Sequence, residues 1–125
     1  MIYGIGTDLL KIERIKNVCE NKNDPFVVHT YTPEEIRLIE SRTIPLYSYA
    51  TRFCGKEAVF KCLNYSESDF HLSDIEILEN ENGMPTVTLY GNLKVFADKN
   101  KISSLHLSLS YDTEYAIAYA LAESY

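Results

Sequence analysis

Apolar residues in the middle of the chain recur with the period of a helix. Pro45 suits a first turn, and the positions that follow at helical spacing are Leu46, Tyr49, Ala50, Phe53, Glu57, Phe60 and Asn64. This pattern predicts one long helix over residues 45–64. Glu57 is the only ionised member of the stripe, one turn from Phe53 and one turn from Lys61. A carboxylate there must be paired, protonated or bound to a cation, because an isolated charge is costly in an apolar setting.

The N-terminal segment combines apolar, glycine and polar stretches. Residues 2–7 have the content of a buried strand, which we expect to end at Asp8. From Leu9 to about Glu20 the apolar residues follow a helical spacing, so this segment is predicted to be the first helix. The polar residues 21–24 predict a loop.

A helix start with favourable capping chemistry follows this loop. Thr32 suits the N-cap, Pro33 the first helical position, and Glu35 completes a capping box. We therefore predict a short helix that ends near Ser41. Capping explains Glu35 without any catalytic role, and we assign it to the cap.

A hairpin and a short helix are predicted next. Residues 74–78 and 86–90 alternate as two strands around Asn82 and Gly83, a pair suited to a turn with positive φ. Residues 91–100 favour a short helix. The inward positions of this helix are predicted to be Leu93, Val95 and Phe96.

Two strands with strict alternation close the chain. In residues 105–110, three leucines share one face, and the other face carries His106, Ser108 and Ser110. In the last strand, alanines oppose larger residues: Ala116, Ala118, Ala120 and Ala122 lie opposite Tyr115, Ile117, Tyr119 and Leu121. The small alanine face suits close packing against the predicted long helix.

These elements predict an α+β fold, in which a mainly antiparallel sheet packs against one long helix. A chain of 125 residues is expected to form a single domain over residues 1–125. No apolar run approaches the roughly 20 residues that span a bilayer, so no membrane partner is expected. The N-terminus lacks the pattern of a secretory signal, and we expect a cytoplasmic protein.

Cysteine content and charge exclude several classes of function. Three cysteines, Cys19, Cys54 and Cys62, form no CxxC or Cys/His cluster, so neither a disulfide framework nor a zinc site is expected. Nothing in the sequence places a base beside Cys54, which argues against a nucleophilic role. The net charge of −6 argues against nucleic acid, whose phosphates attract basic surfaces.

The segment Arg52–Lys61, with the sequence RFCGKEAVFK, holds four ionised side chains within the predicted long helix. One interpretation is structural, because Glu57 and Lys61 are spaced for an ordinary ion pair on a solvated helix face. The other interpretation is a reaction centre in which the charges act on a substrate. Helix periodicity alone favours the structural interpretation.

Two separated motifs resemble a known family. Phe53, Lys56, Glu57, Ala58 and Lys61 match the pattern FxxKEAxxK, and Ile5, Gly6, Thr7 and Asp8 match a GxD signature near the N-terminus. Together they resemble the 4'-phosphopantetheinyl transferases. The chain length and the position of Asp8 resemble the small holo-acyl-carrier-protein synthase branch of that family.

The resemblance implies the transfer of 4'-phosphopantetheine from coenzyme A to a serine of an acyl carrier protein, with release of 3',5'-ADP. It also implies that Asp8 and Glu57 hold a magnesium ion, whose preferred ligands are oxygens. Glu57, or water at the metal, would take the serine proton. Lys61 would neutralise the transferred phosphoryl group or the leaving group.

Further residues are assigned through the same resemblance. Arg52 and Lys56 become candidates for the coenzyme phosphates, although a surface role is the alternative for both. Ser108 and Ser110 are candidates for the nucleotide site, although a polar strand face can also be merely solvated. Arg14 is the candidate for a carrier contact. Small members of the family are homotrimers with active sites between neighbouring subunits, so a homotrimer is expected.

The chain departs from the family pattern at two places. After Leu63 the family carries a glycine-rich loop near the coenzyme phosphates, whereas residues 64–69 contain no glycine and add Glu67 and Asp69. Tyr111 stands where the family has a histidine, and tyrosine offers no positive charge to a 3'-phosphate. The acidic net charge also disfavours an acidic carrier.

We expect an active but divergent transferase. One alternative is a degenerate, non-catalytic relative that binds carrier protein or coenzyme A. A second alternative is a structural oligomeric domain without a ligand.

Overall fold

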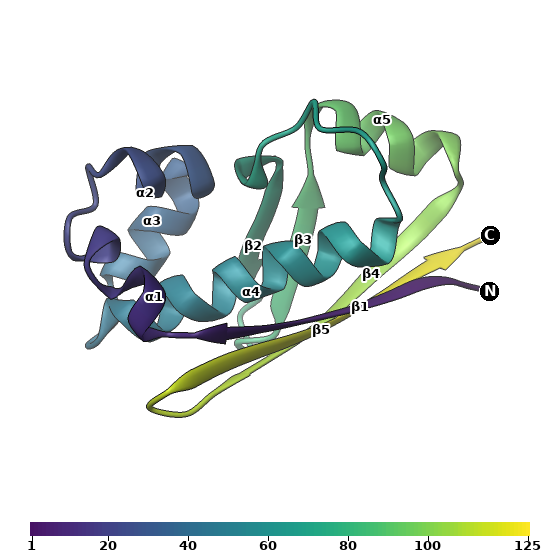
Figure 1. Ribbon diagram of the computed structural model, residues 1–125. Coiled ribbons are helices and arrows are strands. Elements are labelled where there is room, and N and C mark those ends of the chain that lie inside the picture. Colours follow the sequence, from purple (N-terminus) through teal and green to yellow (C-terminus); the bar gives the residue numbers. More distant parts are fainter.

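The computed structural model describes all residues from 1 to 125 and contains five strands, five α-helices and two short 3-10 helices (Figure 1). In chain order they are β1 (Ile2–Lys11), α1 (Glu13–Lys16), η1 (Val18–Glu20), α2 (Pro25–Thr30), α3 (Pro33–Glu40), α4 (Pro45–Leu63), η2 (Leu72–Asp74), β2 (Ile75–Glu79), β3 (Pro85–Leu89), α5 (Gly91–Lys99), β4 (Ile102–Tyr111) and β5 (Tyr115–Ser124). No helix is long and apolar enough to cross a membrane.

The strands form two antiparallel sheets. The larger sheet has the order β1-β5-β4, and β2 pairs with β3 in a separate hairpin. Helix α4 runs along the larger sheet, helices α1 to α3 gather near its N-terminal end, and the two termini of the chain lie close together (Figure 1). The predicted α+β class, with antiparallel strands packed against one long helix, is confirmed.

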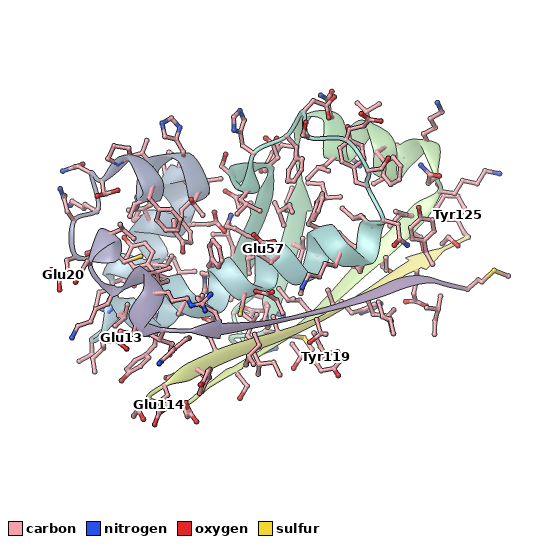
Figure 2. The ribbon with its side chains drawn as sticks, viewed as in Figure 1. Glu13, Glu20, Glu57, Glu114, Tyr119 and Tyr125 are labelled. Atoms are coloured by element: carbon pink, nitrogen blue, oxygen red, sulfur yellow. The ribbon has the colours of Figure 1, made fainter.

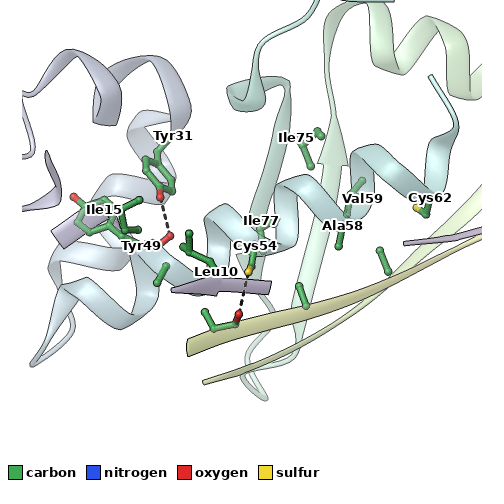
Figure 3. Close-up of a cluster of buried hydrophobic side chains, with 14 of the residues drawn as sticks. Leu10, Ile15, Tyr31, Tyr49, Cys54, Ala58, Val59, Cys62, Ile75 and Ile77 are labelled. Atoms are coloured by element: carbon green, nitrogen blue, oxygen red, sulfur yellow. Dashed lines mark hydrogen bonds between the residues drawn. The ribbon is translucent and has the colours of Figure 1, made fainter. Parts of the chain in front are cut away.

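The alanine face of β5 packs beneath α4, as predicted. Ala116, Ala118, Ala120 and Ala122 are all buried, and their outward neighbours Tyr115, Ile117 and Tyr119 are exposed. The core continues through α4 to the hairpin (Figure 3). Small side chains on the sheet let the helix approach closely, which brings residues of β1 and β5 next to α4.

Strand β1 is longer than the sequence pattern indicated. The prediction that the strand ends at Asp8 and a helix starts at Leu9 is wrong. Asp8 pairs with Ala118, and the ladder continues to Lys11 opposite Tyr115. Leu9 and Leu10 fit a strand as well as a helix, and pairing with β5 satisfies their backbone groups. Only the single turn α1 and the 3-10 helix η1 remain of the predicted first helix.

Two glycines in β1 let the strand lie directly against α4. A Cβ atom added to Gly4 would sit 2.2 Å from the carbonyl oxygen of Cys62. A Cβ atom added to Gly6 would sit 2.1 Å from the carbonyl oxygen of Ala58. Both distances lie inside van der Waals contact, so this approach requires glycine.

The shorter helices agree with the sequence in part. Helix α3 begins with the predicted capping box, in which the side chains of Thr32 and Glu35 each accept a backbone N–H. Helix α2 was not predicted, although Asp24 caps it by accepting from the N–H of Phe26 and Pro25 occupies its first turn. An N-cap aspartate followed by proline is typical of a helix start, but the polar composition of residues 21–24 led to the prediction of a loop.

The C-terminal half also matches the prediction closely. Gly83 has a φ of +80° in the hairpin turn between β2 and β3. In α5, Leu93 is buried and Phe96 is partly buried, but the prediction that Val95 points inward is wrong. Val95 is exposed and Ala97 takes the inner position, because α5 covers the fold along a narrow stripe.

Candidate active site

Strand β1 and helix α4 bring Asp8, Glu57 and Lys61 together. Asp8 follows Gly4 and Gly6 on the face of β1 that packs against α4. The Nζ of Lys61 donates to the Oδ1 of Asp8 at 3.2 Å and to the carbonyl oxygen of Thr7 at 3.0 Å. Glu57 lies one helical turn before Lys61, midway along α4 (Figure 2). The two predicted metal carboxylates and the predicted cation therefore share one location.

The pKa of Glu57 is raised above its ordinary value. Partial burial of the carboxyl is the main cause, and the negative charge of Asp8 adds to it, whereas Lys61 counteracts both. Asp8 thus lies close enough for its charge to act on Glu57. A carboxylate pair held together in this way favours the arrival of a proton or a cation between its members.

Asp8, Glu57 and Lys61 remain accessible from outside. The side chain of Lys61 is 51% exposed and that of Asp8 is 18% exposed. The structure contains no group of three or more histidine, cysteine, aspartate or glutamate side chains arranged to hold a metal. A cation bound by Asp8 and Glu57 would therefore need further oxygen ligands from a substrate or from water. This donor set fits magnesium, which commonly takes one or two carboxylates beside phosphates.

Cys54 is a buried thiol next to this cluster. It donates to the carbonyl oxygen of Ala116 at 3.3 Å (Figure 3). Burial, together with the charges of Asp8 and Glu57, raises its pKa to about 12. Burial and this raised pKa both keep the thiol of Cys54 protonated at neutral pH.

Lys56 lies inside the protein rather than at a surface that a phosphate could reach. Its side chain is fully buried, and its ammonium group donates to Glu35 at 2.7 Å, to the carbonyl oxygen of Ile75 at 2.5 Å and to that of Leu72 at 3.1 Å. These bonds use all three donors. In this arrangement the ammonium of Lys56, which was predicted to bind coenzyme phosphate, has neither a free proton nor solvent access.

Glu35 completes this buried network. Besides its role in the capping box, it accepts from Lys56 and from the backbone N–H of Ile77 at 2.7 Å. Burial raises the pKa of Glu35 and lowers that of Lys56, and the attraction between the two charges opposes both shifts. The pair ties α3, α4 and β2 together. Sequence reasoning found the cap but not the ion pair.

Arg52 faces a cavity on another side of α4. This cavity measures about 800 Å³ and lies among α4, the hairpin and β4. Among its lining residues are Arg42, Tyr47, Arg52, Glu79, Ser108 and Tyr111. The guanidinium of Arg52 lies 3.5 Å from Glu79, which also accepts a hydrogen bond from Arg42. The cavity therefore has an arginine-rich wall with a single carboxylate between the two cations.

An aromatic stack borders the same cavity. The rings of Tyr47 and Tyr111 are stacked, with centroids 4.9 Å apart and planes 18° apart. Tyr47 was not among the sequence candidates. Tyr47 could have been found from the sequence, because Ser48, Thr51 and Arg52 come after it on the polar side of the long helix. The prediction considered only the apolar side of that helix.

The three polar positions on β4 differ in location. Ser108 borders the cavity, whereas Ser110 is exposed and does not line it. His106 lies 2.6 Å from Glu123, away from the cavity. Of the two serines predicted for the nucleotide site, the structure brings only Ser108 to the arginine-rich cavity.

The cavity and the acidic cluster lie on different sides of α4. Gly55 faces the hairpin and β4, since a Cβ atom there would meet Ile77, Leu107 and Leu109. Glu57 is two residues further on, which turns it about 200° around the helix axis. Asp8, Glu57 and Lys61 do not line the cavity. Within one chain, the predicted metal-binding carboxylates and the predicted nucleotide-binding residues therefore lie on different sides of α4.

The segment that replaces the glycine-rich loop is held by side chains. Phe70 stacks on Phe60 with centroids 4.6 Å apart, and Tyr65 packs edge-on against Phe70. Asp69 accepts hydrogen bonds from Tyr65 and from Asn92. Both donors are neutral, so they hold the Asp69 side chain in place without compensating its negative charge.

Arg14 is exposed on the single turn of α1. Lys11 and Lys16 are also exposed beside it. The structure thus leaves this basic residue free for a partner, at the end of the molecule where α1 to α3 gather (Figure 1).

Comparison with known proteins agrees with this arrangement. The family model for the 4'-phosphopantetheinyl transferase superfamily matches residues 4–120. A holo-[acyl-carrier-protein] synthase of Clostridium kluyveri is 39% identical over 123 residues, which cover 98% of this chain and 91% of the relative.

Solved structures of the same kind superpose well on the chain. The holo-[acyl-carrier-protein] synthase of Neisseria meningitidis aligns with a TM-score of 0.87 at 29% identity, covering 99% of this chain and 100% of that one. The enzyme of Helicobacter pylori, solved in complex with coenzyme A, aligns with a TM-score of 0.81 at 30% identity, covering 95% and 99%. With the motifs, the fold and these matches in agreement, the chain belongs to the 4'-phosphopantetheinyl transferase superfamily.

Proposed function

We propose that this protein is a holo-acyl-carrier-protein synthase. It transfers 4'-phosphopantetheine from coenzyme A to a serine hydroxyl of an apo acyl carrier protein and releases 3',5'-ADP. The observation that carries the proposal is the convergence of Asp8, Glu57 and Lys61 from a strand and a helix far apart in sequence. The structural interpretation of Glu57 and Lys61 as a simple helix pair is insufficient, because Lys61 forms its ion pair with Asp8 of β1 and not with Glu57.

The transfer forms a bond between the serine oxygen and the β-phosphorus of coenzyme A. The bond from that phosphorus to the bridging oxygen breaks, and 3',5'-ADP leaves with the electron pair. Glu57 is the base that takes the serine proton. Before a cation binds, the raised pKa of Glu57 brings its basicity closer to neutral pH than that of an ordinary glutamate, and a bound cation would lower that pKa.

A magnesium ion held by Asp8 and Glu57 would offset the negative charge of the diphosphate oxygens. Lys61 stands beside both carboxylates and is half exposed, so it can turn to the phosphoryl group and neutralise it. Lys61 also offsets part of the negative charge of Asp8 and Glu57 through its bond to Asp8.

Arg52 and Ser108 are proposed to hold the nucleotide part of coenzyme A in the arginine-rich cavity. The planar guanidinium of Arg52 suits a phosphate that displaces Glu79. Lys56 is not included, because it is enclosed with Glu35. Ser110 stays a candidate only through a neighbouring subunit, since its side chain is exposed outside the cavity of its own chain.

A homotrimer is proposed for two reasons. The outer face of the β1-β5 pair exposes apolar side chains, among them Ile5 (67% exposed), Leu9 (63%) and Tyr119 (59%). Such a face is typical of a surface covered by another protein. In addition, a neighbouring copy can bring its cavity to the acidic cluster of this chain, which one chain alone does not do. Light scattering on the purified protein measures the number of subunits.

The proposed partner is an acidic carrier protein that docks at Arg14. Lys11 lies 4.0 Å from the exposed Glu13, so Arg14 and Lys16 carry the local positive charge on a chain whose net charge is −6. The proposed reaction serves fatty acid biosynthesis and takes place in the cytoplasm. The three free, buried cysteines fit that compartment, where thiols stay reduced.

The test incubates the protein with magnesium, coenzyme A and apo carrier protein, and follows the carrier by mass spectrometry. We expect the carrier to gain one phosphopantetheine, and Glu57→Ala to abolish the gain. Glu81→Ala, at an exposed residue of the hairpin turn, is the matched control and keeps the activity. The non-catalytic alternative predicts coenzyme binding without any mass gain on the carrier, and the fixed acidic Asp69 is the observation in its favour.

A further inference from the structure

The stack of Tyr47 and Tyr111 is not explained by the chemistry proposed above. Each ring covers one face of the other, and Tyr111 is still 56% exposed. What distinguishes Tyr111 from the other exposed tyrosines is its stacked partner Tyr47 at the edge of a cavity. Because both tyrosines line the arginine-rich cavity, this surface is open to whatever the cavity binds.

The cavity joins two kinds of recognition. Arg42 and Arg52 supply two cations that suit phosphate groups, whereas the tyrosine stack supplies a flat apolar wall. A ligand that matches both is a nucleotide, which carries an aromatic base and anionic phosphates. Stacking of a base on an aromatic side chain typically improves affinity about tenfold or more.

The charge balance of the cavity favours the base over the phosphates. Glu79 accepts from both guanidinium groups, so two arginines and one carboxylate leave a single net positive charge at that wall. Tyr111 adds a neutral hydroxyl and no cation. Each phosphate must also compete with Glu79 for its arginine, which weakens the gain from each phosphate contact.

We infer that Tyr47 and Tyr111 form a specificity wall that stacks on the adenine ring of coenzyme A, so that this protein selects its coenzyme through the base more than through the 3'-phosphate. This inference rests on the proposed function, since it concerns the coenzyme cavity. The tyrosines hold the nucleotide in place and take no part in the bond changes.

Calorimetry with three soluble probes tests the wall directly. The probes are 3',5'-ADP, 5'-AMP, which lacks the 3'-phosphate, and ribose 5-phosphate, which also lacks the base. We expect affinity to fall less than fivefold from 3',5'-ADP to 5'-AMP, and about tenfold or more from 5'-AMP to ribose 5-phosphate. A larger loss at the first step than at the second would overturn the inference.

Substitutions of the two tyrosines supply the second measurement. Tyr111→Leu and Tyr47→Leu are expected to weaken 5'-AMP binding about tenfold and to leave ribose 5-phosphate binding unchanged. Tyr111→Phe keeps a ring and is expected to restore 5'-AMP affinity to within twofold. Tyr125→Leu, at an exposed tyrosine near the C-terminus, is the matched control. The inference is contradicted if the leucine variants weaken the binding of 5'-AMP and of ribose 5-phosphate equally. It is also contradicted if neither leucine variant weakens 5'-AMP binding.

Two controls separate failure of this inference from failure of the proposed function. Thermal unfolding of each variant establishes that a loss of binding does not come from a loss of fold. The carrier mass assay with the unaltered protein then tests transfer by itself. If the protein transfers phosphopantetheine but its nucleotide affinity does not depend on Tyr47 and Tyr111, only the inference about the tyrosines is refuted. If nucleotide binding depends on the base but no transfer occurs, the proposed enzyme activity is refuted and the inference about the tyrosines stands.

Discussion

The ammonium group of Lys61 lies 3.2 Å from a carboxylate oxygen of Asp8, although 53 positions separate the two residues. This contact joins α4 to β1 and places a cation beside the two acids, Asp8 and Glu57. Without it, two carboxylates would face each other with no compensating charge. The contact explains how the chain holds a repulsive pair in place before any substrate or metal ion arrives.

Glu57→Gln is expected to lower the rate of transfer about 100- to 10,000-fold, because it removes the proposed base. The same change should stabilise the protein at neutral pH. The pKa of Glu57 is raised from its ordinary value of 4.5 by folding, so the folded state retains a proton that the unfolded chain releases. The free energy of unfolding therefore falls as pH rises from 4.5 through the raised pKa.

Urea denaturation of both proteins between pH 4.5 and pH 8 measures this effect of Glu57. The midpoints should diverge as pH rises, with Glu57→Gln the more stable variant at the upper end. Glu81→Gln serves as the control on an exposed turn and should follow the unaltered protein. Identical pH profiles for Glu57→Gln and the unaltered protein would show that Glu57 is not electrostatically strained.

Lys61→Met should move the acid limb of the pH–rate profile to higher pH. Lys61 lowers the pKa of Glu57, and its removal leaves burial and Asp8 as the only causes of the shift. The base then stays protonated to a higher pH, so turnover falls most at acidic pH. Lys61→Arg keeps the cation and should return the limb toward its original position. An unchanged acid limb in Lys61→Met would mean that Lys61 does not act on Glu57.

The strongest sequence predictions concerned elements whose period is unambiguous. The alanine alternation in β5, the Asn82-Gly83 turn and the capping box at Thr32 all appear in the structure as predicted. Residues 9–11 were misassigned because Leu9 and Leu10 fit either period, and only pairing with β5 decides between them. That information lies more than a hundred positions away in the sequence.

The candidate site was predictable in its residue types but not in its geometry. Helix periodicity placed Glu57 and Lys61 on one face, and the resemblance added Asp8, which the structure brings to the same point. The ion pair of Lys56 and Glu35 was missed, because a charged residue inside a helix gives no sign of where its partner lies. The cavity was also missed, since its lining comes from the connection before α4, from α4 itself, from the hairpin and from β4.

Lys56→Met should destabilise the protein by about 3–5 kcal/mol, since it leaves Glu35 buried without its cation. Urea denaturation measures the loss, and the double variant Lys56→Met with Glu35→Gln should lose less than the sum of the two single variants. Under conditions where Lys56→Met stays folded, its affinity for 3',5'-ADP should be unchanged. Weak nucleotide binding by a folded Lys56→Met protein would return Lys56 to the coenzyme site.

Gly6→Ala should separate β1 from α4 and so disturb Asp8, two residues along the same strand face. The added Cβ atom would lie 2.1 Å from the carbonyl oxygen of Ala58, and neither backbone can yield without moving the strand or the helix. We expect a loss of about 1–3 kcal/mol in the free energy of unfolding together with a loss of transfer activity. Gly83→Ala is the matched control for stability alone, because its added Cβ atom meets nothing and its cost comes only from the positive φ in an exposed turn. If Gly6→Ala lowers stability no more than Gly83→Ala and keeps full activity, the close approach of β1 to α4 does not position Asp8.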